Sequence, residues 1–344
     1  MSRQRVLVTG GAGFIGSNFV RYLLSHDEQV EVVNFDALSY SGNLENLDDV
    51  AKDPRYRFVR GDICDTAEVE SVMTEVDSAV HFAAESHVDR SILDSRPFVR
   101  TNVLGTQTLL DAAVRTKLKR FVHVSTDETY GSLPLDRPEQ RFDEESPIRP
   151  NSPYAASKAA SDMLVRAYCH TFGLAAIITR CSNNFGPYQF PEKVIPLFVT
   201  NLLEGRKVPL YGDGRNVRDW IHVEDHCEAL AAVLQRGRPG EVYNIGGDNE
   251  RSNLELTHTI LEIMDMDEGR IEYVKDRPGH DRRYAVDSSK IREELGWRPT
   301  RSQWPAALAE TVRWYVDNPT WWQRVRSGAY REYYQRQYVQ RDSS

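Results

Sequence analysis

The fold is decided by the stretch Thr9-Gly10-Gly11-Ala12-Gly13-Phe14-Ile15-Gly16, which follows an apolar run at 6–9 and leads into an amphipathic segment at 14–24. The glycines fit both G-x-G-x-x-G, starting at Gly11, and G-x-x-G-x-x-G, starting at Gly10. Glycines let a strand-to-helix turn tighten and let its backbone approach a pyrophosphate at the helix N-terminus. Taken alone, the string is also compatible with a tight turn that binds no ligand.

An acidic residue strengthens the dinucleotide interpretation. Asp36 follows the apolar run at 30–35 and lies about 20 residues beyond Gly16, where a carboxylate can accept hydrogen bonds from the adenosine ribose hydroxyls. Residues 37–40 contain no Arg or Lys, so nothing there would offset the repulsion between Asp36 and a 2′-phosphate. The sequence therefore favours NAD over NADP as the cofactor.

Short apolar runs alternate with helical periodicity through the first half of the chain. Strands are predicted at 6–9, 30–35, 57–59, 79–83 and 121–125, helices at 14–24, 67–75, 101–115 and 153–171, and further strands at 175–180 and 241–245. This alternation predicts an α/β fold with a Rossmann-like, doubly wound parallel sheet. Three more strand-to-helix junctions, at 61–63, 83–86 and 125–127, fall at the sheet edge where such folds bind ligands.

The 344 residues suit two domains or one large α/β unit. We expect an NAD-binding domain over 1–184, with a returning segment near 215–250. The pattern becomes irregular and richer in Pro and Trp after about residue 185, so 185–344 is expected to be mainly a smaller α/β substrate-binding domain. Without a low-complexity linker between them, the two parts should share a broad interface that holds the ligand.

Composition excludes several classes of protein. The net charge of −8 argues against nucleic-acid binding, which clustered Lys and Arg drive. No window is long and apolar enough for a membrane helix, and the first residues run directly into a strand without a signal peptide. Four widely spaced cysteines indicate reduced thiols and no metal site. We therefore expect a cytoplasmic protein.

Two further patterns receive a structural interpretation. His222 and His226 have the spacing of a helical metal pair, but no third ligand is evident, so we interpret them as helix-start and packing residues. Aromatic residues gather near the C-terminus, namely Trp304, Trp314, Trp321, Trp322 and many tyrosines. The acidic balance makes domain packing a better explanation for them than a stacking surface.

A catalytic pair is predicted at the start of the helix over 153–171. Tyr154 and Lys158 lie at i and i+4 and project from the same helix face. An ammonium beside a tyrosine stabilises its phenolate, which can then take a proton from a sugar hydroxyl. Tyr-x-x-x-Lys is common on amphipathic helices, where it usually means packing. Downstream of a dinucleotide motif and of Ser125-Thr126, the catalytic interpretation is favoured.

Together these residues resemble the extended short-chain dehydrogenase/reductase family, and within it the dTDP-glucose 4,6-dehydratases. Thr126-Asp127-Glu128-Thr129-Tyr130-Gly131 is similar to their Thr-Asp-Glu-Val-Tyr-Gly motif, whereas epimerases and decarboxylases of the family lack the Asp-Glu pair. Further similar stretches span nearly the whole chain, at 84–91, 183–193, 218–220 and 277–284. The departures are Thr129, where the motif has Val, and Phe185, where it usually has Tyr. Neither is a reacting group, so they concern fine substrate preference.

The resemblance implies an NAD-dependent hydro-lyase that converts dTDP-glucose to dTDP-4-keto-6-deoxyglucose and water, with hydride moved from C4 to C6. Oxidation at C4 acidifies the hydrogen on C5, and elimination of water then needs one base and one acid. By this analogy Glu128 is the base at C5 and Asp127 is the acid at the C6 hydroxyl. Two adjacent carboxyls can divide this work only if one is ionised and the other protonated.

The resemblance also implies the remaining site residues. Besides Tyr154 and Lys158, the expected cofactor-binding residues are Gly10, Gly13, Phe14, Ile15, Gly16, Asp36, Leu38, Ser39, Asp62, Ile63, Ala83, Ala84, Ser86, Thr101 and Asn184. The expected substrate-binding residues are Ser86, Thr126, Asn183, Lys193, Val194, Pro209, Tyr211, Arg218, Asn253, Arg277 and His280. A homodimer is expected by the same analogy, because the helices at 101–115 and 153–171 carry apolar faces that could pair across a two-fold axis.

Two alternatives stay open at this point. A UDP-sugar epimerase or decarboxylase of the same family would share the scaffold, although the Asp127-Glu128 pair counts against it. A non-catalytic NAD-binding protein would share the fold, although it would not need Thr126, Tyr154 and Lys158. The pathway served and the strictness for thymine are not specified by the sequence.

Overall fold

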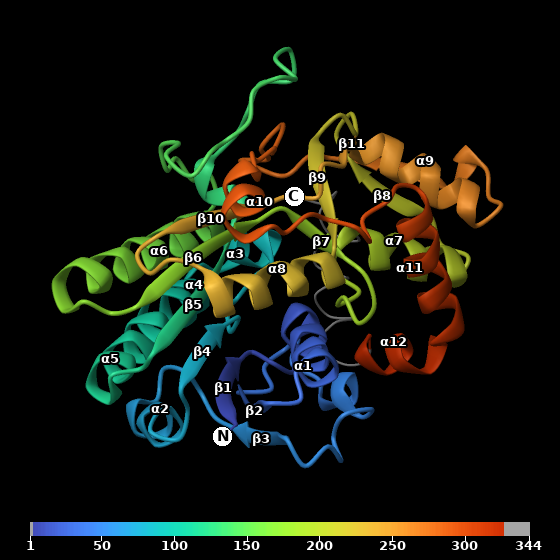
Figure 1. Cartoon of the computed structure of the whole chain (residues 1–344). Helices are drawn as coiled ribbons and strands as arrows, with labels where there is room; N and C mark the ends of the chain where they lie inside the picture. Colours follow the sequence, from blue (N-terminus) through green and yellow to red (C-terminus); the bar gives the residue numbers. More distant parts are fainter. Residues whose placement is uncertain (1–2, 327–344) are drawn as a thin grey trace.

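The computed structural model of the chain describes residues 3–326. Its largest element is a seven-stranded sheet in the order β10-β6-β5-β4-β1-β2-β3, and every adjacent pair is parallel. The strands are β1 (Gln4–Thr9), β2 (Val30–Asp36), β3 (Tyr56–Arg60), β4 (Ser78–His81), β5 (Arg120–Thr126), β6 (Ala176–Cys181) and β10 (Val242–Ile245). The predicted doubly wound parallel sheet is confirmed (Figure 1).

Helices cover both faces of this sheet. Along β1, Leu7 packs with α2 (Thr66–Met73), α5 (Thr106–Thr116) and α6 (Pro153–Phe172). Its neighbours Val6 and Val8 point to the opposite face, where α1 (Phe14–His26), α8 (Val223–Arg236) and α10 (Ser289–Leu295) lie. Because both faces are buried, the strands are almost continuously apolar, as parallel strands between two helical layers must be.

Two sequence predictions near the site need correction. The helix expected from residue 101 begins as a π-helical turn, η2 (Val99–Gly105), and only then continues as α5. Buried Asn102 explains this turn, because its side chain accepts a hydrogen bond from the backbone N–H of Glu85 at 2.8 Å and donates to Ser157 at 2.8 Å. The strand expected over 79–83 ends at His81, and the chain then turns across the sheet edge.

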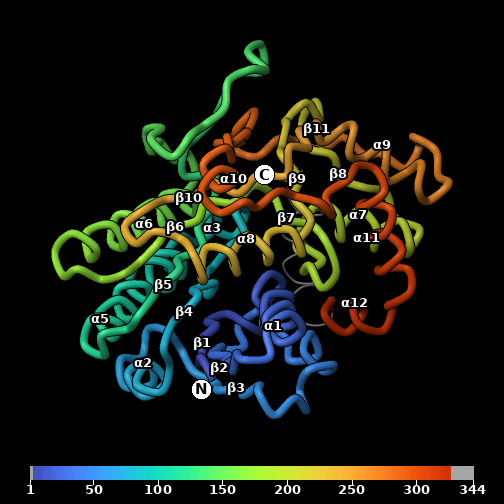
Figure 2. Tube along the Cα trace, viewed as in Figure 1, coloured from blue at the N-terminus to red at the C-terminus, as the bar shows by residue number. Residues whose placement is uncertain are grey.

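The second half of the chain builds a smaller α/β layer beside the sheet (Figure 2). It contains a three-stranded sheet of β11 (Glu250–Ser252), β9 (Val217–His222) and β7 (Asn183–Phe185). A two-stranded sheet joins β12 (Ile271–Val274) to β8 (Val208–Tyr211). The helices of this layer are α7 (Val194–Leu203), α9 (Asn253–Ile263), α11 (Ala306–Asp317) and α12 (Pro319–Val325).

The C-terminal tryptophans belong to the apolar core of this layer. Trp321 and Trp322 are buried, and Trp304 and Trp314 pack against the same cluster. The packing interpretation of these aromatic residues is therefore confirmed. Within 215–250, α8 packs on the first sheet and β10 extends it, while β9 belongs to the three-stranded sheet, and the returning segment stays a prediction. The domain boundary at residue 184 stays a prediction.

Shorter elements connect the layers. They are η1 (Leu44–Leu47), α3 (Val88–Leu93), α4 (Arg96–Phe98), η3 (Asp127–Tyr130) and η4 (Glu268–Arg270). None of the helices within residues 3–326 combines the length and the hydropathy that crossing a bilayer requires.

Candidate active site

A cavity of about 810 Å³ opens where β1, β2, β4, β5 and β6 end, between the large sheet and the segment 182–193. This is the edge at which doubly wound folds bind their ligands, and the volume suits a cofactor together with a substrate. Of the expected cofactor and catalytic residues, those on the cavity wall are Gly10, Gly13, Phe14, Ile15, Gly16, Asp36, Ser39, Asp62, Ile63, Ala83, Ala84, Ser86, Thr101, Thr126, Asp127, Glu128, Tyr154, Lys158 and Asn184. Leu38 alone among them lies outside the wall.

The glycine-rich loop closes tightly against the neighbouring strand end. Gly10 has a φ of +69°, and a Cβ there would meet the backbone nitrogen of Ala83 at 2.6 Å. A Cβ on Gly16 would meet the carbonyl oxygen of Gly10 at 2.3 Å. Gly13 is the N-cap of α1 and has no side chain to cap it, which leaves the first helical N–H groups available to an anion.

Asp36 stands beside this loop. Its carboxylate accepts hydrogen bonds from the backbone N–H groups of Ala12 at 2.9 Å and Leu38 at 2.8 Å. Burial raises the pKa of Asp36, and these two N–H groups oppose the shift. A glycine cradle at a helix N-terminus with a carboxylate beside it matches the pyrophosphate and ribose of a dinucleotide. The residues present therefore fit NAD.

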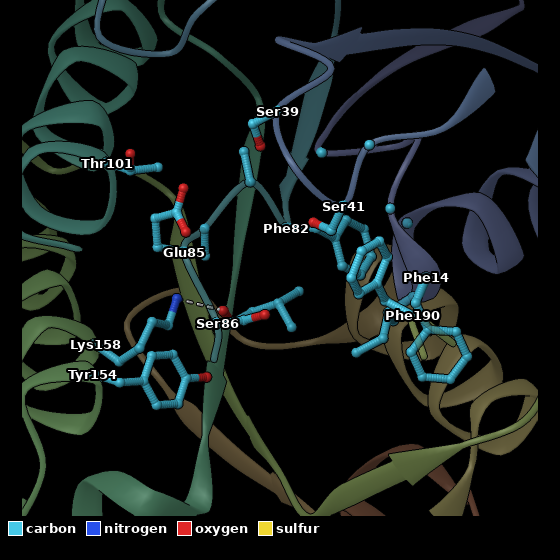
Figure 3. Close-up of a pocket in the computed structure, with 18 of the residues that line it drawn as sticks. Phe14, Ser39, Ser41, Phe82, Glu85, Ser86, Thr101, Tyr154, Lys158 and Phe190 are labelled. Atoms are coloured by element: carbon cyan, nitrogen blue, oxygen red, sulfur yellow. Dashed lines mark hydrogen bonds between the residues drawn. The ribbon is translucent and has the colours of Figure 1, made fainter. Parts of the chain in front are cut away.

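The catalytic side chains converge from β5 and α6. Ser152 caps α6 by accepting from the backbone N–H of Ala155, which places Tyr154 and Lys158 in the first turns. Figure 3 shows these two side chains projecting from one helix into the cavity, across from Phe14 and Phe190. Both Tyr154 and Lys158 are buried, so their charge states depend on the surroundings and little on bulk water.

Tyr154 and Lys158 have strongly shifted pKa values. Burial raises the pKa of Tyr154 well above its ordinary value, the Glu128 charge adds to the shift, and a hydrogen bond with Thr126 opposes it. Burial lowers the pKa of Lys158 to about 8. The Lys158 Nζ donates to the backbone carbonyl of Val124 at 2.8 Å. Activation of the Tyr154 phenolate by Lys158 stays a prediction.

The two adjacent carboxyls have different environments. Burial and then the Glu128 charge raise the pKa of Asp127 well above its ordinary value, and its Oδ2 has no hydrogen-bond partner within residues 3–326. Burial also raises the pKa of Glu128, but the positive charges of Arg277, Lys193 and Arg218 oppose that rise. The surroundings thus raise the pKa of Asp127 more strongly than that of Glu128, which is the direction that a division into acid and base requires.

The expected substrate residues fall into two groups. Ser86, Thr126, Asn183 and Lys193 lie on the cavity wall, and Lys193 donates to the Ser86 carbonyl at 2.8 Å. Outside the wall lie Val194, Pro209, Tyr211, Arg218, Asn253, Arg277 and His280.

Ion pairs and hydrogen bonds hold several members of the outer group. Arg277 and Tyr211 both contact the carboxylate of buried Asp89, at 3.3 and 3.0 Å. His280 contacts Asp276 at 2.6 Å. Arg218 lies over the ring of Tyr284, with its guanidinium carbon 4.2 Å from the ring centroid. Arg218 and Arg277 lie near the end of the cavity that contains Asp127 and Glu128, since their charges oppose the rise in the pKa of Glu128.

Several residues of the wall were not anticipated. Tyr40 and Phe82 are each next to an expected site residue, and Phe190 lies in the similar stretch at 183–193, so these positions could have been included. Arg100 was not predictable from spacing. It lines the adenosine end and forms an ion pair with Asp62 at 2.8 Å, so its charge is already neutralised.

Four other sequence expectations concern residues beside the site. Thr129 and Phe185, the two departures from the family motif, are fully buried and lie off the cavity wall, so they serve packing. His222 caps α8, and His226 contacts the Asn184 side chain at 2.8 Å. These contacts are the helix-start and packing roles expected of the two histidines.

Comparisons with known proteins agree with this geometry. A family model described as GDP-mannose 4,6 dehydratase matches residues 7–304. A dTDP-glucose 4,6-dehydratase from Actinoplanes sp. is 57% identical, over 93% of this chain and 100% of that protein. The crystal structure of a dTDP-glucose 4,6-dehydratase from Streptomyces venezuelae with NAD bound is 54% identical, covers 94% of this chain and 100% of its own, and superimposes with a TM-score of 0.91.

Related sugar epimerases share the fold at lower identity. A UDP-glucuronic acid 4-epimerase from Bacillus cereus, solved with its nucleotide sugar and NAD, is 28% identical over 91% of this chain and 99% of its own, with a TM-score of 0.85. The fold alone therefore does not separate dehydration from epimerisation. The identity of 57% over nearly the full length does separate them, and the chain belongs to the dTDP-glucose 4,6-dehydratase family of NAD-dependent nucleotide-sugar enzymes.

Proposed function

We propose that this chain converts dTDP-glucose to dTDP-4-keto-6-deoxyglucose and water. The observation that carries the proposal is the pair of adjacent carboxyls whose surroundings differ, since three cations oppose the rise in the pKa of Glu128 while the pKa of Asp127 is raised much further. Asp127 and Glu128 open onto the same cavity as Tyr154, and the far end of that cavity fits NAD. An epimerase has no need of an acid and a base side by side, because it eliminates nothing.

The first chemical task is oxidation at C4 of the glucose. Tyr154, as phenolate, takes the proton of the C4 hydroxyl. Thr126 donates a hydrogen bond to the Tyr154 oxygen, which stabilises the negative charge of the phenolate. NAD, when bound, accepts hydride from C4 and returns it to C6. Because burial raises the pKa of Tyr154, the phenolate forms only with positive charge nearby, which the Lys158 ammonium on the same wall supplies.

The second task is elimination of water across C5 and C6. Ionised Glu128 takes the C5 proton, which the C4 ketone has made acidic, while protonated Asp127 gives its proton to the C6 hydroxyl as that group leaves as water. The double bond between C5 and C6 is then reduced at C6, and Glu128 returns a proton to C5. At the end Tyr154 holds one extra proton and Asp127 lacks one, so Tyr154 releases a proton to solvent and Asp127 takes one up. The proton on Glu128 exchanges with solvent before it returns to C5.

The nucleotide diphosphate needs local cations in a chain of net charge −8. Lys193 on the wall, with Arg218 and Arg277 behind the acidic end, supports a diphosphate position beyond Glu128. Guanidinium groups bind such oxygens through two parallel hydrogen bonds. The proposed substrate thus lies with its sugar among the carboxyls and its diphosphate among these cations.

Incubation with dTDP-glucose in deuterated water tests the proposal. Dehydration gives a 4-keto-6-deoxy sugar with solvent deuterium at C5, detected by mass and NMR. A new hexose without deuterium would instead indicate an epimerase, loss of carbon dioxide from a uronic-acid substrate would indicate a decarboxylase, and unchanged sugar would indicate a non-catalytic NAD-binding protein. A panel of nucleotide-glucoses then measures how strictly thymine is required.

A homodimer in the cytoplasm is part of the same proposal. Leu104 in η2 and Met163 in α6 are exposed apolar side chains on two elements that contact each other, which supports pairing with a second copy. Sedimentation of the wild type and of Met163→Glu tests the pairing. All four cysteines are free thiols, which supports a reducing compartment.

A further inference from the structure

The C-terminal helix α12 docks beneath the glycine-rich loop. In Figures 1 and 2 this helix lies next to the blue N-terminal part of the chain, although the two are at opposite ends of the sequence. Two contacts join it to η1. Buried Trp321 donates its indole N–H to the Asn46 Oδ1 at 2.9 Å, and Arg324 pairs with Glu45 at 2.7 Å.

Asn46 connects Trp321 to the glycine-rich loop through hydrogen bonds of its side-chain amide. Its Oδ1 accepts from Trp321, and its Nδ2 donates to the backbone carbonyl of Ala12 at 2.9 Å. The backbone N–H of Ala12 donates in turn to Asp36 at 2.9 Å. A buried series of hydrogen bonds therefore runs from α12 through Asn46 to the residue between two glycines of the loop, and on to the expected ribose carboxylate.

Aromatic packing keeps Trp321 in place. Its ring lies against Tyr188 and Trp314, with centroid separations of 5.8 and 5.1 Å. Arg21 of α1 covers the other side of Tyr188, with its guanidinium carbon 4.1 Å from the ring centroid. Rings packed in this way allow little rotation, so the indole N–H of Trp321 keeps its direction. The hydrogen bond from this N–H in turn holds the side chain of Asn46 in place.

We propose that Trp321 and Asn46 are positioning residues for NAD, which hold the glycine-rich loop in its binding conformation and slow release of the cofactor. The N–H of Ala12 is hydrogen-bonded to Asp36 and its carbonyl to Asn46. These two bonds set the orientation of the peptide groups next to Gly13 without a contribution from the ligand. A preorganised anion site loses less entropy on binding than a mobile one. This inference rests on the proposed use of NAD, and it adds a contribution from α12 to a cavity whose wall is formed by residues between 10 and 193.

The test compares two neighbouring tryptophans in the full-length holoenzyme. Trp321→Phe removes the indole N–H but keeps an aromatic ring. Trp322→Phe is the matched control, because Trp322 is equally buried in the same helix but donates to the Tyr315 carbonyl at 2.9 Å, away from the loop. Exchange of bound NAD for isotope-labelled NAD gives the release rate. We expect Trp321→Phe to release NAD about fivefold faster than Trp322→Phe, the size of one net buried hydrogen bond.

The outcomes separate this inference from the proposed function. Failure of the wild type to bind NAD would count against the proposed function. Equal release rates in the two variants would overturn the positioning role while leaving the reaction untouched. If Trp321→Phe does not fold, Arg324→Gln weakens the neighbouring contact of α12 with Glu45 of η1, and NAD should leave about twofold faster than from the wild type. An unchanged rate in that variant overturns the inference.

Discussion

The two ends of the cavity are lined by different kinds of chemical group. At the cofactor end the loop from Gly10 to Gly16 and the junction at Ala83 present mainly backbone and small side chains to the cavity. At the sugar end the wall consists of buried ionisable groups, namely Asp127, Glu128 and Tyr154, with Arg277 behind them. A rigid backbone recognises the shape of a cofactor, whereas buried charges prepare groups for proton transfer.

This difference predicts different consequences of mutation. Changes in the loop from Gly10 to Gly16 should act on NAD affinity through steric displacement, since this loop carries no charged side chain. Changes at the sugar end should act on rate and on its pH dependence, because each charge modifies the pKa of its neighbours. The predictions below run from the largest expected effect to the smallest.

The largest effects are expected at the sugar end, from Tyr154 and Glu128. Tyr154→Phe removes the proton acceptor, and kcat should fall about a thousandfold without any absorbance from reduced NAD. Glu128→Gln should lower kcat by a similar factor, but it leaves oxidation possible, so reduced NAD should accumulate on the enzyme. Rapid-mixing absorbance at saturating dTDP-glucose distinguishes the two variants. The opposite pattern would reverse the assigned roles.

At the cofactor end, Gly16→Ala should act on NAD binding. The added Cβ would meet the Gly10 carbonyl oxygen at 2.3 Å, so the loop must move. Displacements of this kind cost about 1–3 kcal/mol, and we expect the Kd of NAD to rise about thirtyfold. Gly13→Ala is the graded control, because its Cβ would meet the same oxygen at 3.3 Å. Calorimetric titration of the cofactor-free variants measures both, and equal losses would show that the loop is not closed as described.

Sequence reasoning worked best where local motifs and topology act together. Three motifs lie at the carboxyl ends of parallel strands, namely the loop from Gly10 to Gly16, Asp36 and Thr126. The carboxyl ends of parallel strands meet at one edge of the sheet. Once the alternation predicted a doubly wound sheet, the convergence of these motifs followed. The Asp127-Glu128 pair was recognisable for the same reason, since it comes directly after β5.

Contacts between residues far apart in sequence were not predictable in this way. Asp89 and Arg277 are separated by 188 positions, and no local pattern pairs them. The π-helical turn at η2 likewise depends on Asn102 reaching Glu85 and Ser157, which belong to other elements. Trp321 was interpreted as packing, and its hydrogen bond to Asn46 depends on where α12 docks.

The Asp89–Arg277 pair gives a smaller effect at the sugar end. Asp89→Asn keeps the side-chain volume and an acceptor for Tyr211, but it removes the charge that holds Arg277. If Arg277 binds the diphosphate in ground and transition states alike, the KM for dTDP-glucose should rise about tenfold with kcat within about twofold. Steady-state kinetics measures this split. Asp213→Asn, which breaks an exposed pair with Arg282, is the control and should change neither constant.

The smallest effect is a shift in pH dependence after Arg277→Gln. Burial raises the pKa of Glu128 and the Arg277 charge opposes that rise, so loss of the charge raises the pKa further. Since Glu128 must be ionised, the acid limb of kcat/KM, which reports the free enzyme, should move to higher pH. The alkaline limb should move less, because burial and the Glu128 charge are the main causes of the raised Asp127 pKa. Arg282→Gln should leave both limbs in place, and equal movement of the two limbs after Arg277→Gln would show that the carboxyls do not titrate in separate environments.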